Sequence, residues 1–320
     1  MASSQSLIVL TFLSVLAVPF VYGEGVSLWV SGVSASSGWI DVNKAHVPYS
    51  GEDAWEVGNG NINARTDVSL CWAAQSSNML QYWQNAYLAA GNVLPAGAPD
   101  GLVVGREDKT RRQYQIFEYF ISNWSDAGGD GEYGIPWYLV GEIADDYPTN
   151  NYRWSQCFGG MESGGLFKNV YSSYSDLVGG DFKTYDFTFI SSLSDFSALL
   201  RECIQDEQAV VGLNIYIPRD SGNPLKHAVT LWGCDYDAAG LVSKVYLTDS
   251  DDGEIALKAF GLSEDADGVY LTDYSDAGLT RIQDLSMLSV ARFMPIPEPS
   301  AFGLLAGIFM LGIAGSRRRK

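Results

Sequence analysis

Histidine and cysteine are scarce in this sequence. Its 320 residues include two histidines, His46 and His227, and four cysteines. Any mechanism that needs an imidazole therefore has two candidates. The zinc-peptidase motif His-Glu-x-x-His is absent and the cysteines form no Cys-x-x-Cys pair, which argues against a zinc site. We expect a protein that needs no metal and no organic cofactor.

Basic residues are also few. Lysine and arginine together number 20, against 38 aspartates and glutamates, which gives a formal net charge of −18. A polyanion without a basic stripe has no electrostatic footprint for a phosphate backbone, so nucleic acid is excluded as a partner. The hydrophobic content of 47% with 18% charged residues is typical of a chain that folds into a globular domain.

An almost uninterrupted apolar run occupies residues 7–21, near the N-terminus. It ends in Val21-Tyr22-Gly23, with small residues at the two positions that a signal peptidase reads. We therefore expect residues 1–23 to be a secretory signal peptide. The alternative is an N-terminal membrane anchor, for which the run is short.

The C-terminal residues 295–320 combine three features of an address signal. The sequence Pro-Glu-Pro-Ser at 297–300 is followed by an apolar stretch at 301–315 and a basic cluster at 317–320. This order resembles the PEP-CTERM sorting tail of exported bacterial proteins. The resemblance implies a Gram-negative-type host, transient membrane association through the tail, cleavage near Pro297 by an exosortase-type sorting enzyme, and a final place at the cell surface or outside the cell. A permanent tail anchor is the alternative.

Between these ends, residues 24–294 contain no internal repeat, low-complexity tract or proline-rich linker, so we expect one domain. Apolar residues recur at spacings of three and four after Ser69, and Gly91 ends the pattern. This predicts a helix over residues 69–91 with Asp67 or Ser69 as its N-cap. Two further helices are predicted, at residues 114–124 and at residues 196–203 behind a Ser194 cap.

The C-terminal half of the domain reads as a sheet. β-branched and aromatic residues alternate there with Asp and Gly turns, which predicts strands at residues 210–217, 228–234, 242–248 and 268–272. Helices followed by an antiparallel sheet define an α+β fold. Residues 49–67, rich in glycine and asparagine, are expected to form an extended loop or an insertion.

Cys71 differs from the other cysteines because it begins a predicted helix. Unpaired backbone N–H groups and the positive end of the helix dipole lower a thiol's pKa there, so Cys71 is the candidate nucleophile. The alternative is a core cysteine that happens to lie at a helix start. Cys203 and Cys234 are expected to be buried thiols, with a disulfide as the alternative. Cys157, in a glycine-rich loop, is the best candidate for a disulfide whose partner the sequence does not identify.

His227 opens a strand that the turn at residues 237–240 reverses. Antiparallel pairing about this turn places His227 across from residues 249–251. An imidazole and two carboxylates, Asp249 and Asp251, should therefore lie together. A carboxylate beside an imidazole fixes its tautomer and stabilises the imidazolium, which is the orienting role in a catalytic triad. The alternative is that both aspartates are solvated turn residues.

These segments resemble a known family. Residues 70–74 (Leu-Cys-Trp-Ala-Ala), 227–237 and 245–251, with 28–33 and 38–44 upstream, are similar in order and type to the streptococcal immunoglobulin G-degrading cysteine peptidases. That family is papain-like. The resemblance implies an α+β fold in which a helical first half, with the catalytic cysteine at a helix N-terminus, packs on an antiparallel sheet.

Carried over residue by residue, the resemblance makes Cys71 the nucleophile, His227 the general base, Asp249 the residue that orients the histidine, and Asp251 a supporting carboxylate. The family's oxyanion-hole lysine follows Gly-Trp-x-Asp, and Lys44 holds that position, with a surface lysine as the alternative.

The resulting functional expectation is an exported cysteine endopeptidase that hydrolyses a protein or peptide substrate through a thioester. The immunoglobulin target is not carried over, because a sorting tail of this kind suggests an environmental bacterium. One alternative is a non-catalytic surface or biofilm-matrix protein that binds rather than cleaves. Another is an acyl-transfer enzyme that delivers the acyl group to an amine.

Both ends of the chain should be removed during export. We expect a mature protein that starts near Glu24 and ends near Pro297, because each end bears a processing signal. Intact mass of the protein recovered from its native host measures this. Recovery of a chain that still carries residues 317–320 would instead support a permanent anchor.

Overall fold

The computed structural model describes residues 25–44, 67, 69–103, 114–124, 129–142, 163–186, 188, 190–220 and 222–294. The predicted signal peptide and sorting tail lie outside the described residues, as do His46, Cys157 and residues 49–66 of the predicted insertion. Within these ranges, no helix is long and apolar enough to cross a membrane.

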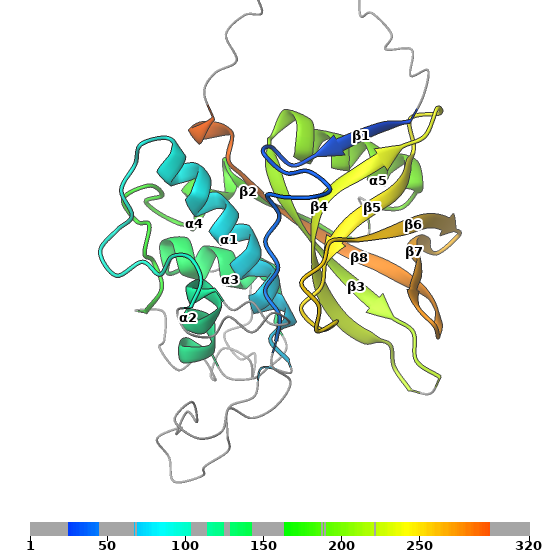
Figure 1. Cartoon of the computed structure of the whole chain (residues 1–320), viewed down its shortest axis with the longest axis horizontal. Coiled ribbons are helices and arrows are strands. Elements are labelled where there is room, and N and C mark those ends of the chain that lie inside the picture. Colours follow the sequence, from blue (N-terminus) through cyan, green and yellow to red (C-terminus); the bar gives the residue numbers. More distant parts are fainter. Residues whose placement is uncertain are drawn as a thin grey trace, which may run out of the picture.

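The described strands form one antiparallel sheet whose middle closes on itself. Their bounds are β1 Val26–Trp29, β2 Phe182–Tyr185, β3 Ala209–Ile217, β4 Leu225–Tyr236, β5 Val242–Thr248, β6 Lys258–Asp265, β7 Gly268–Ser275 and β8 Gly278–Ser289. Neighbours follow the order β4-β3-β8-β7-β6-β5, and β5 also pairs with β4. These six strands therefore form a closed barrel, to which β1 adds along β4 and β2 along β8 (Figure 1).

This barrel corrects the predicted fold class. The expected papain-like α+β arrangement, with a helical first half packed on an antiparallel sheet, is wrong, because the described chain is mostly β, with a closed barrel and few helices. Closure depends on β4, which has 12 residues. Its first part pairs with β3 and its last part pairs with β5. Register shifts between Leu231 and Gly233 and between Asp235 and Tyr236 bend β4 toward β5. Hydrophobic alternation predicts where strands lie but does not predict such bends.

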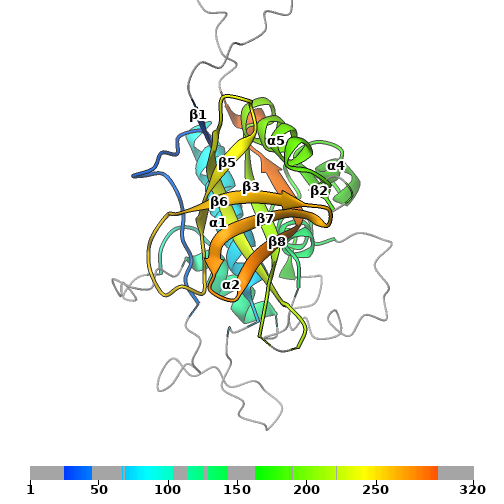
Figure 2. The ribbon, with the colours of Figure 1, turned by 90° about the vertical axis from the view of Figure 1, so that its right-hand side faces the viewer.

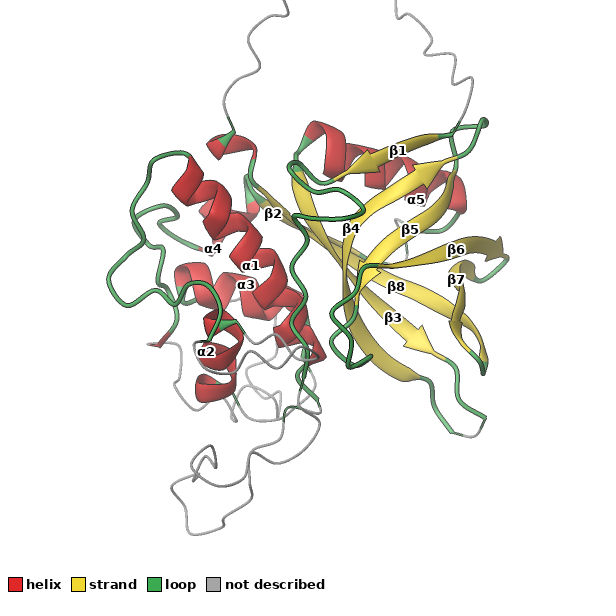
Figure 3. Cartoon of the chain, in the orientation of Figure 1, coloured by secondary structure: helices red, strands yellow, loops and turns green. Residues whose placement is uncertain are grey.

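Helices gather on one side of the barrel (Figure 3). Their bounds are α1 Cys71–Ala89, α2 Gln115–Asn123, α3 Gly131–Val140, α4 Tyr174–Val178 and α5 Leu193–Arg201, which continues as a π-helical turn over Glu202–Asp206. The first four lie beside the barrel wall, whereas α5 packs against β5 and β7 at one end of it (Figure 2). The sequence did not predict α3, because Gly134 and Pro136 interrupt it.

Two predicted helix caps are also wrong. The N-cap of α1 is Leu70, whose side chain makes no capping hydrogen bond, in place of the expected Asp67 or Ser69. The N-cap of α5 is Ser192, whose hydroxyl accepts from the amide of Asp195, in place of the expected Ser194.

Aromatic side chains pack the helices against one another beside the barrel. Trp83 packs edge-on against Phe167 and is stacked with Tyr87, while Trp72 meets Phe120 and Trp124 edge-on. Such ring contacts add to the apolar area that the helices bury. They fix α1 as the central helix of the group, with its N-terminus at the barrel wall.

The pairing of β1 with the barrel strand β4 leads to a prediction at Gly233, which lies opposite Trp29. A Cβ at Gly233 would lie 2.4 Å from the Trp29 ring. Gly233→Ala should therefore lower the free energy of unfolding by about 1–3 kcal/mol, in the range of overpacked sites. Denaturant unfolding measures this. The matched control is Gly180→Ala, whose Cβ would meet its nearest neighbour at 3.7 Å and should change stability by less than about 0.5 kcal/mol. Equal effects at the two sites would contradict the packing argument.

Candidate active site

Helix α1 is fixed to the barrel by buried amide side chains. Gln75 Nε2 donates to the carbonyl oxygens of Leu213 in β3 and Val229 in β4, at 2.9 Å each. One turn on, Asn78 Nδ2 donates to Thr230 Oγ1 at 3.0 Å. Because buried amides without partners are costly, these contacts select one position of the helix along the wall. That position brings Cys71, the first residue of α1, next to the start of β4.

His227 lies in β4 with its side chain 3% exposed. Its Nε2 is 2.7 Å from Asp249 Oδ1. Since an ionised carboxylate can only accept, Nε2 carries the hydrogen and donates it to Asp249. The Cys71 thiol helps to raise the pKa of the ring, and because Nε2 is engaged with Asp249, Nδ1 is the nitrogen left for the thiol. The structure thus brings Cys71, His227 and Asp249 into one row.

Asp249 has two further hydrogen bonds that hold it in place. Its Oδ1 accepts from the amide of Asp251 at 2.9 Å, and its Oδ2 accepts from the hydroxyl of Tyr274. The carboxylate therefore receives one donor from the ring, one from its own turn and one from β7. Tyr274 was not among the sequence candidates, because no sequence spacing connects residue 274 to the turn at 249.

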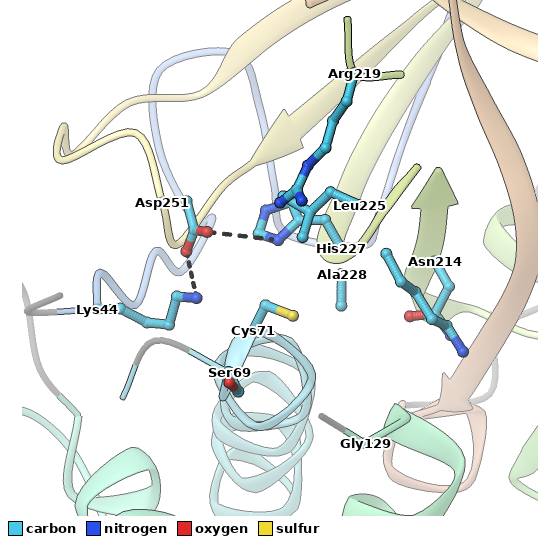
Figure 4. A pocket seen from close by; sticks show the side chains of 11 residues that line it. Lys44, Ser69, Cys71, Gly129, Asn214, Arg219, Leu225, His227, Ala228 and Asp251 are labelled. Carbon is cyan, nitrogen blue, oxygen red and sulfur yellow. Dashed lines mark ion pairs between the residues drawn. The ribbon is translucent and has the colours of Figure 1, made fainter. Parts of the chain in front are cut away.

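Lys44 and Asp251 complete the cluster as an ion pair. Lys44 Nζ lies 2.6 Å from Asp251 Oδ1, and Asp251 Oδ2 lies 3.7 Å from His227 Nδ1 (Figure 4). The Lys44 side chain is 1% exposed, so the expected alternative of a surface lysine is wrong.

The segment that carries Lys44 is held from both sides. The amide of Val42 donates to Asn78 Oδ1 in α1, and the amide of Lys44 donates to the carbonyl of Ser250. The same helix that carries Cys71 therefore also positions the lysine.

Charges in the cluster stabilise one another. Burial alone would raise the pKa of the Cys71 thiol, but the hydrogen bond and charge of His227, with help from Lys44, hold that pKa below its usual value. Burial would lower the pKa of His227, yet Asp249 and Cys71 raise it to about 10. Burial likewise opposes ionisation of Asp249, and His227 overcomes this to hold its pKa at about 2. Each of these shifts favours the charged form of its group, which is the thiolate of Cys71, the imidazolium of His227 and the carboxylate of Asp249.

A cavity of about 390 Å³ opens over Cys71 and His227. Its wall combines the catalytic candidates with residues of β3, β4 and the segment before α3, namely Lys44, Ser69, Cys71, Gly129, Asn214, Arg219, Leu225, Lys226, His227, Ala228 and Asp251 (Figure 4). The thiol thus faces a space that an extended peptide segment can enter.

Three groups in the cluster are of metal-ligand type. His227, Asp249 and Asp251 offer ligand atoms that all lie within 4.8 Å of one another. Each is also engaged with protein, since Asp249 accepts from His227 and Asp251 pairs with Lys44. These contacts account for the arrangement without an ion, as a hydrogen-bonded His227–Asp249 pair beside the Lys44–Asp251 ion pair.

The other described cysteines are buried in the core. Cys203 and Cys234 are free thiols, as expected, and burial raises the pKa of each to about 12. At neutral pH both are therefore protonated and poorly nucleophilic. Cys71 is half-buried and lines the cavity.

Comparison with known proteins supports a relation to proteases. Residues 162–276, which include His227, Asp249 and Asp251, match the family model described as Mac-1 (Mac 1). A protein of Streptococcus suis (strain P1/7) described as an IgM protease is 24% identical to the chain over 276 residues. That alignment covers 75% of this chain and 22% of the relative, so the chain spans about a fifth of the length of the curated relative that it matches.

The lowered pKa of Cys71 predicts how the rate of thiol labelling should depend on pH. In the folded chain, Cys71 should react with iodoacetamide at a lower pH than an ordinary thiol, whose pKa is about 8.5. His227→Ala removes the group that lowers the pKa and leaves burial, so the inflection should move to higher pH. Peptide mapping after labelling at a series of pH values measures both. An unchanged profile in His227→Ala, or faster labelling of Cys203 or Cys234, would contradict the assignment.

Proposed function

We propose that this chain is an exported cysteine endopeptidase that hydrolyses peptide bonds with Cys71, His227 and Asp249. The observation that carries the proposal is that Cys71 and His227 line one cavity, while the His227 ring is hydrogen-bonded behind it to the Asp249 carboxylate. The relation to a protein described as an IgM protease supports the same class of reaction. The identity of the substrate protein is not part of the proposal.

In the first half-reaction, the Cys71 thiolate attacks the peptide carbonyl carbon and forms a tetrahedral intermediate. His227 then gives its Nδ1 proton to the leaving amine, and the carbon–nitrogen bond breaks to leave a thioester on Cys71. Asp249 keeps the ring in the orientation and tautomer that this transfer needs, because it accepts from Nε2 throughout.

In the second half-reaction, His227 takes a proton from water, and the resulting nucleophile attacks the thioester. The intermediate expels the thiolate, which releases the acid product and restores the thiolate–imidazolium pair. The alternative acyl-transfer reaction differs only in that an amine replaces water at this step. Product analysis by mass spectrometry distinguishes the two outcomes.

The negative oxygen of each intermediate needs hydrogen-bond donors. The Cys71 amide lies in the first turn of α1, where backbone N–H groups have no partner within the helix, and it is the first proposed donor. The second is Lys44, whose ammonium group lines the same cavity and is held by Asp251. A preorganised donor of this kind contributes about 10²–10³-fold to kcat.

The proposed roles rank a set of substitutions. Cys71→Ala and His227→Ala should leave no measurable turnover. Asp249→Ala should lower kcat by about 10³–10⁴-fold, because the ring loses both its orientation and its counter-charge. Asp249→Asn keeps a hydrogen-bond acceptor without the charge and should lie between Asp249→Ala and wild type. Release of new peptide termini from a protein digest, followed by mass spectrometry, gives the rates.

Lys44→Met is the informative variant for the oxyanion role, with Asp251→Asn beside it. Loss of an oxyanion donor should lower kcat by about 10²-fold with little change in KM. Each variant must first match the wild-type circular dichroism spectrum and melting temperature, since both residues are also structural. Full turnover in both Asp249→Ala and Asp251→Ala would refute the triad, and full turnover in Cys71→Ala would refute Cys71 as the nucleophile. No turnover by the intact chain would leave a non-catalytic binding protein.

A further inference from the structure

Arg219 is a charged residue of the cavity that the proposed mechanism does not use. It lies two residues beyond the last pair of the β3–β4 ladder, Ile217 with Leu225. Its side chain reaches from that connection into the cavity over Cys71 and His227 (Figure 4). Neighbouring Pro218 is close to Gly278 at the start of β8, where an added Cβ would meet the proline ring at 3.7 Å. The backbone position of Arg219 is thus fixed by its connection to β3 and by the contact of Pro218 with β8.

The partners of the cavity's three cations differ. Lys44 Nζ is 2.6 Å from Asp251, and Lys226 Nζ is 2.7 Å from Asp130. Within the part of the chain that the structure describes, Arg219 makes no hydrogen bond or ion pair. The lack of a carboxylate partner for Arg219 is notable because acidic residues outnumber basic ones in this chain, by 38 to 20.

A guanidinium group is suited to a carboxylate that comes from outside. It presents several N–H donors in a rigid plane that matches the two oxygens of a carboxylate, and it stays charged at every working pH. Charge-assisted bonds of this kind are stronger than neutral ones. Arg219 can therefore bind an acidic side chain that enters the cavity.

We propose that Arg219 is a specificity-determining residue that binds an aspartate or glutamate side chain of the substrate close to the scissile bond. This inference deepens the proposed function and rests on it for the hydrolysis that it directs. The substrates it favours are protein segments with an acidic residue in the few positions around the cleaved bond.

The experiment uses both a binding and a cleavage measurement. Immobilised full chain carrying Cys71→Ala is equilibrated with a mixed-sequence peptide library, and the bound peptides are sequenced by mass spectrometry. The intact chain is assayed in parallel on pairs of quenched fluorescent peptides that differ only by Glu or Gln near the cleaved bond. Arg219→Gln and Arg219→Glu are compared in both formats, with Lys244→Gln, an exposed lysine of β5, as the matched change of charge.

The expected result is enrichment of acidic peptides that Arg219→Gln abolishes and Arg219→Glu reverses toward basic peptides. In cleavage, Arg219→Gln should raise KM for the Glu peptide by about 5- to 50-fold, the range of one charged hydrogen-bonded contact, and leave kcat and the Gln peptide nearly unchanged. Added salt should weaken the wild-type preference. Lys244→Gln should behave as wild type.

The two measurements separate failure of this inference from failure of the proposed function. If the intact chain cleaves peptides but shows no acidic preference, or keeps that preference in Arg219→Gln, the assignment of Arg219 is overturned and the peptidase stands. If the Cys71→Ala chain enriches acidic peptides through Arg219 while the intact chain cleaves nothing, the peptidase fails and the binding role of Arg219 stands.

Discussion

The candidate site depends on the docking of one helix against the wall of the barrel. Gln75 of α1 donates to carbonyl oxygens of two adjacent strands, β3 and β4, that belong to the same wall. These bonds lie in the interior, where a lost partner is expensive, so the helix has one favourable position. That position decides the distance between the Cys71 thiol and the His227 ring, because the first sits on the helix and the second on the wall. Asn78 extends the same constraint to the segment that carries Lys44.

The second constraint is the largely buried carboxylate of Asp249, whose side chain is 15% exposed. A buried charge is tolerated only with opposite charge and donors around it, and Asp249 receives donors from His227, from the Asp251 amide and from Tyr274. In return it favours the charged form of His227, and His227 in turn lowers the pKa of the Cys71 thiol. The three groups are therefore interdependent, which explains why removing any one of them should affect the others more than its own contact alone would suggest. The ion pair of Lys44 and Asp251 flanks this row.

The sequence predicted the local elements of the site better than the fold. The helix that begins at Cys71 and the hairpin of β4 and β5 followed from apolar spacing and from a turn at 237–240. Barrel closure did not follow, because it depends on bends in β4 that alternation does not encode. Tyr274 and Gln75 were missed for a related reason. Their roles come from contacts between distant strands and helices, and a tyrosine in a strand or a glutamine in a helix looks ordinary until the tertiary structure gives it a partner.

The most direct test of the central claim is capture of the thioester on Cys71. The chain is mixed with a reactive peptide ester, quenched with acid within the first turnover, digested and analysed by mass spectrometry. The account predicts the mass of the acyl group on the peptide that contains Cys71, its absence in Cys71→Ala, and its accumulation when Asp249→Ala slows hydrolysis of the intermediate more than its formation. Cleavage of the ester by wild type and Cys71→Ala alike, with no acyl group on Cys71, would contradict it.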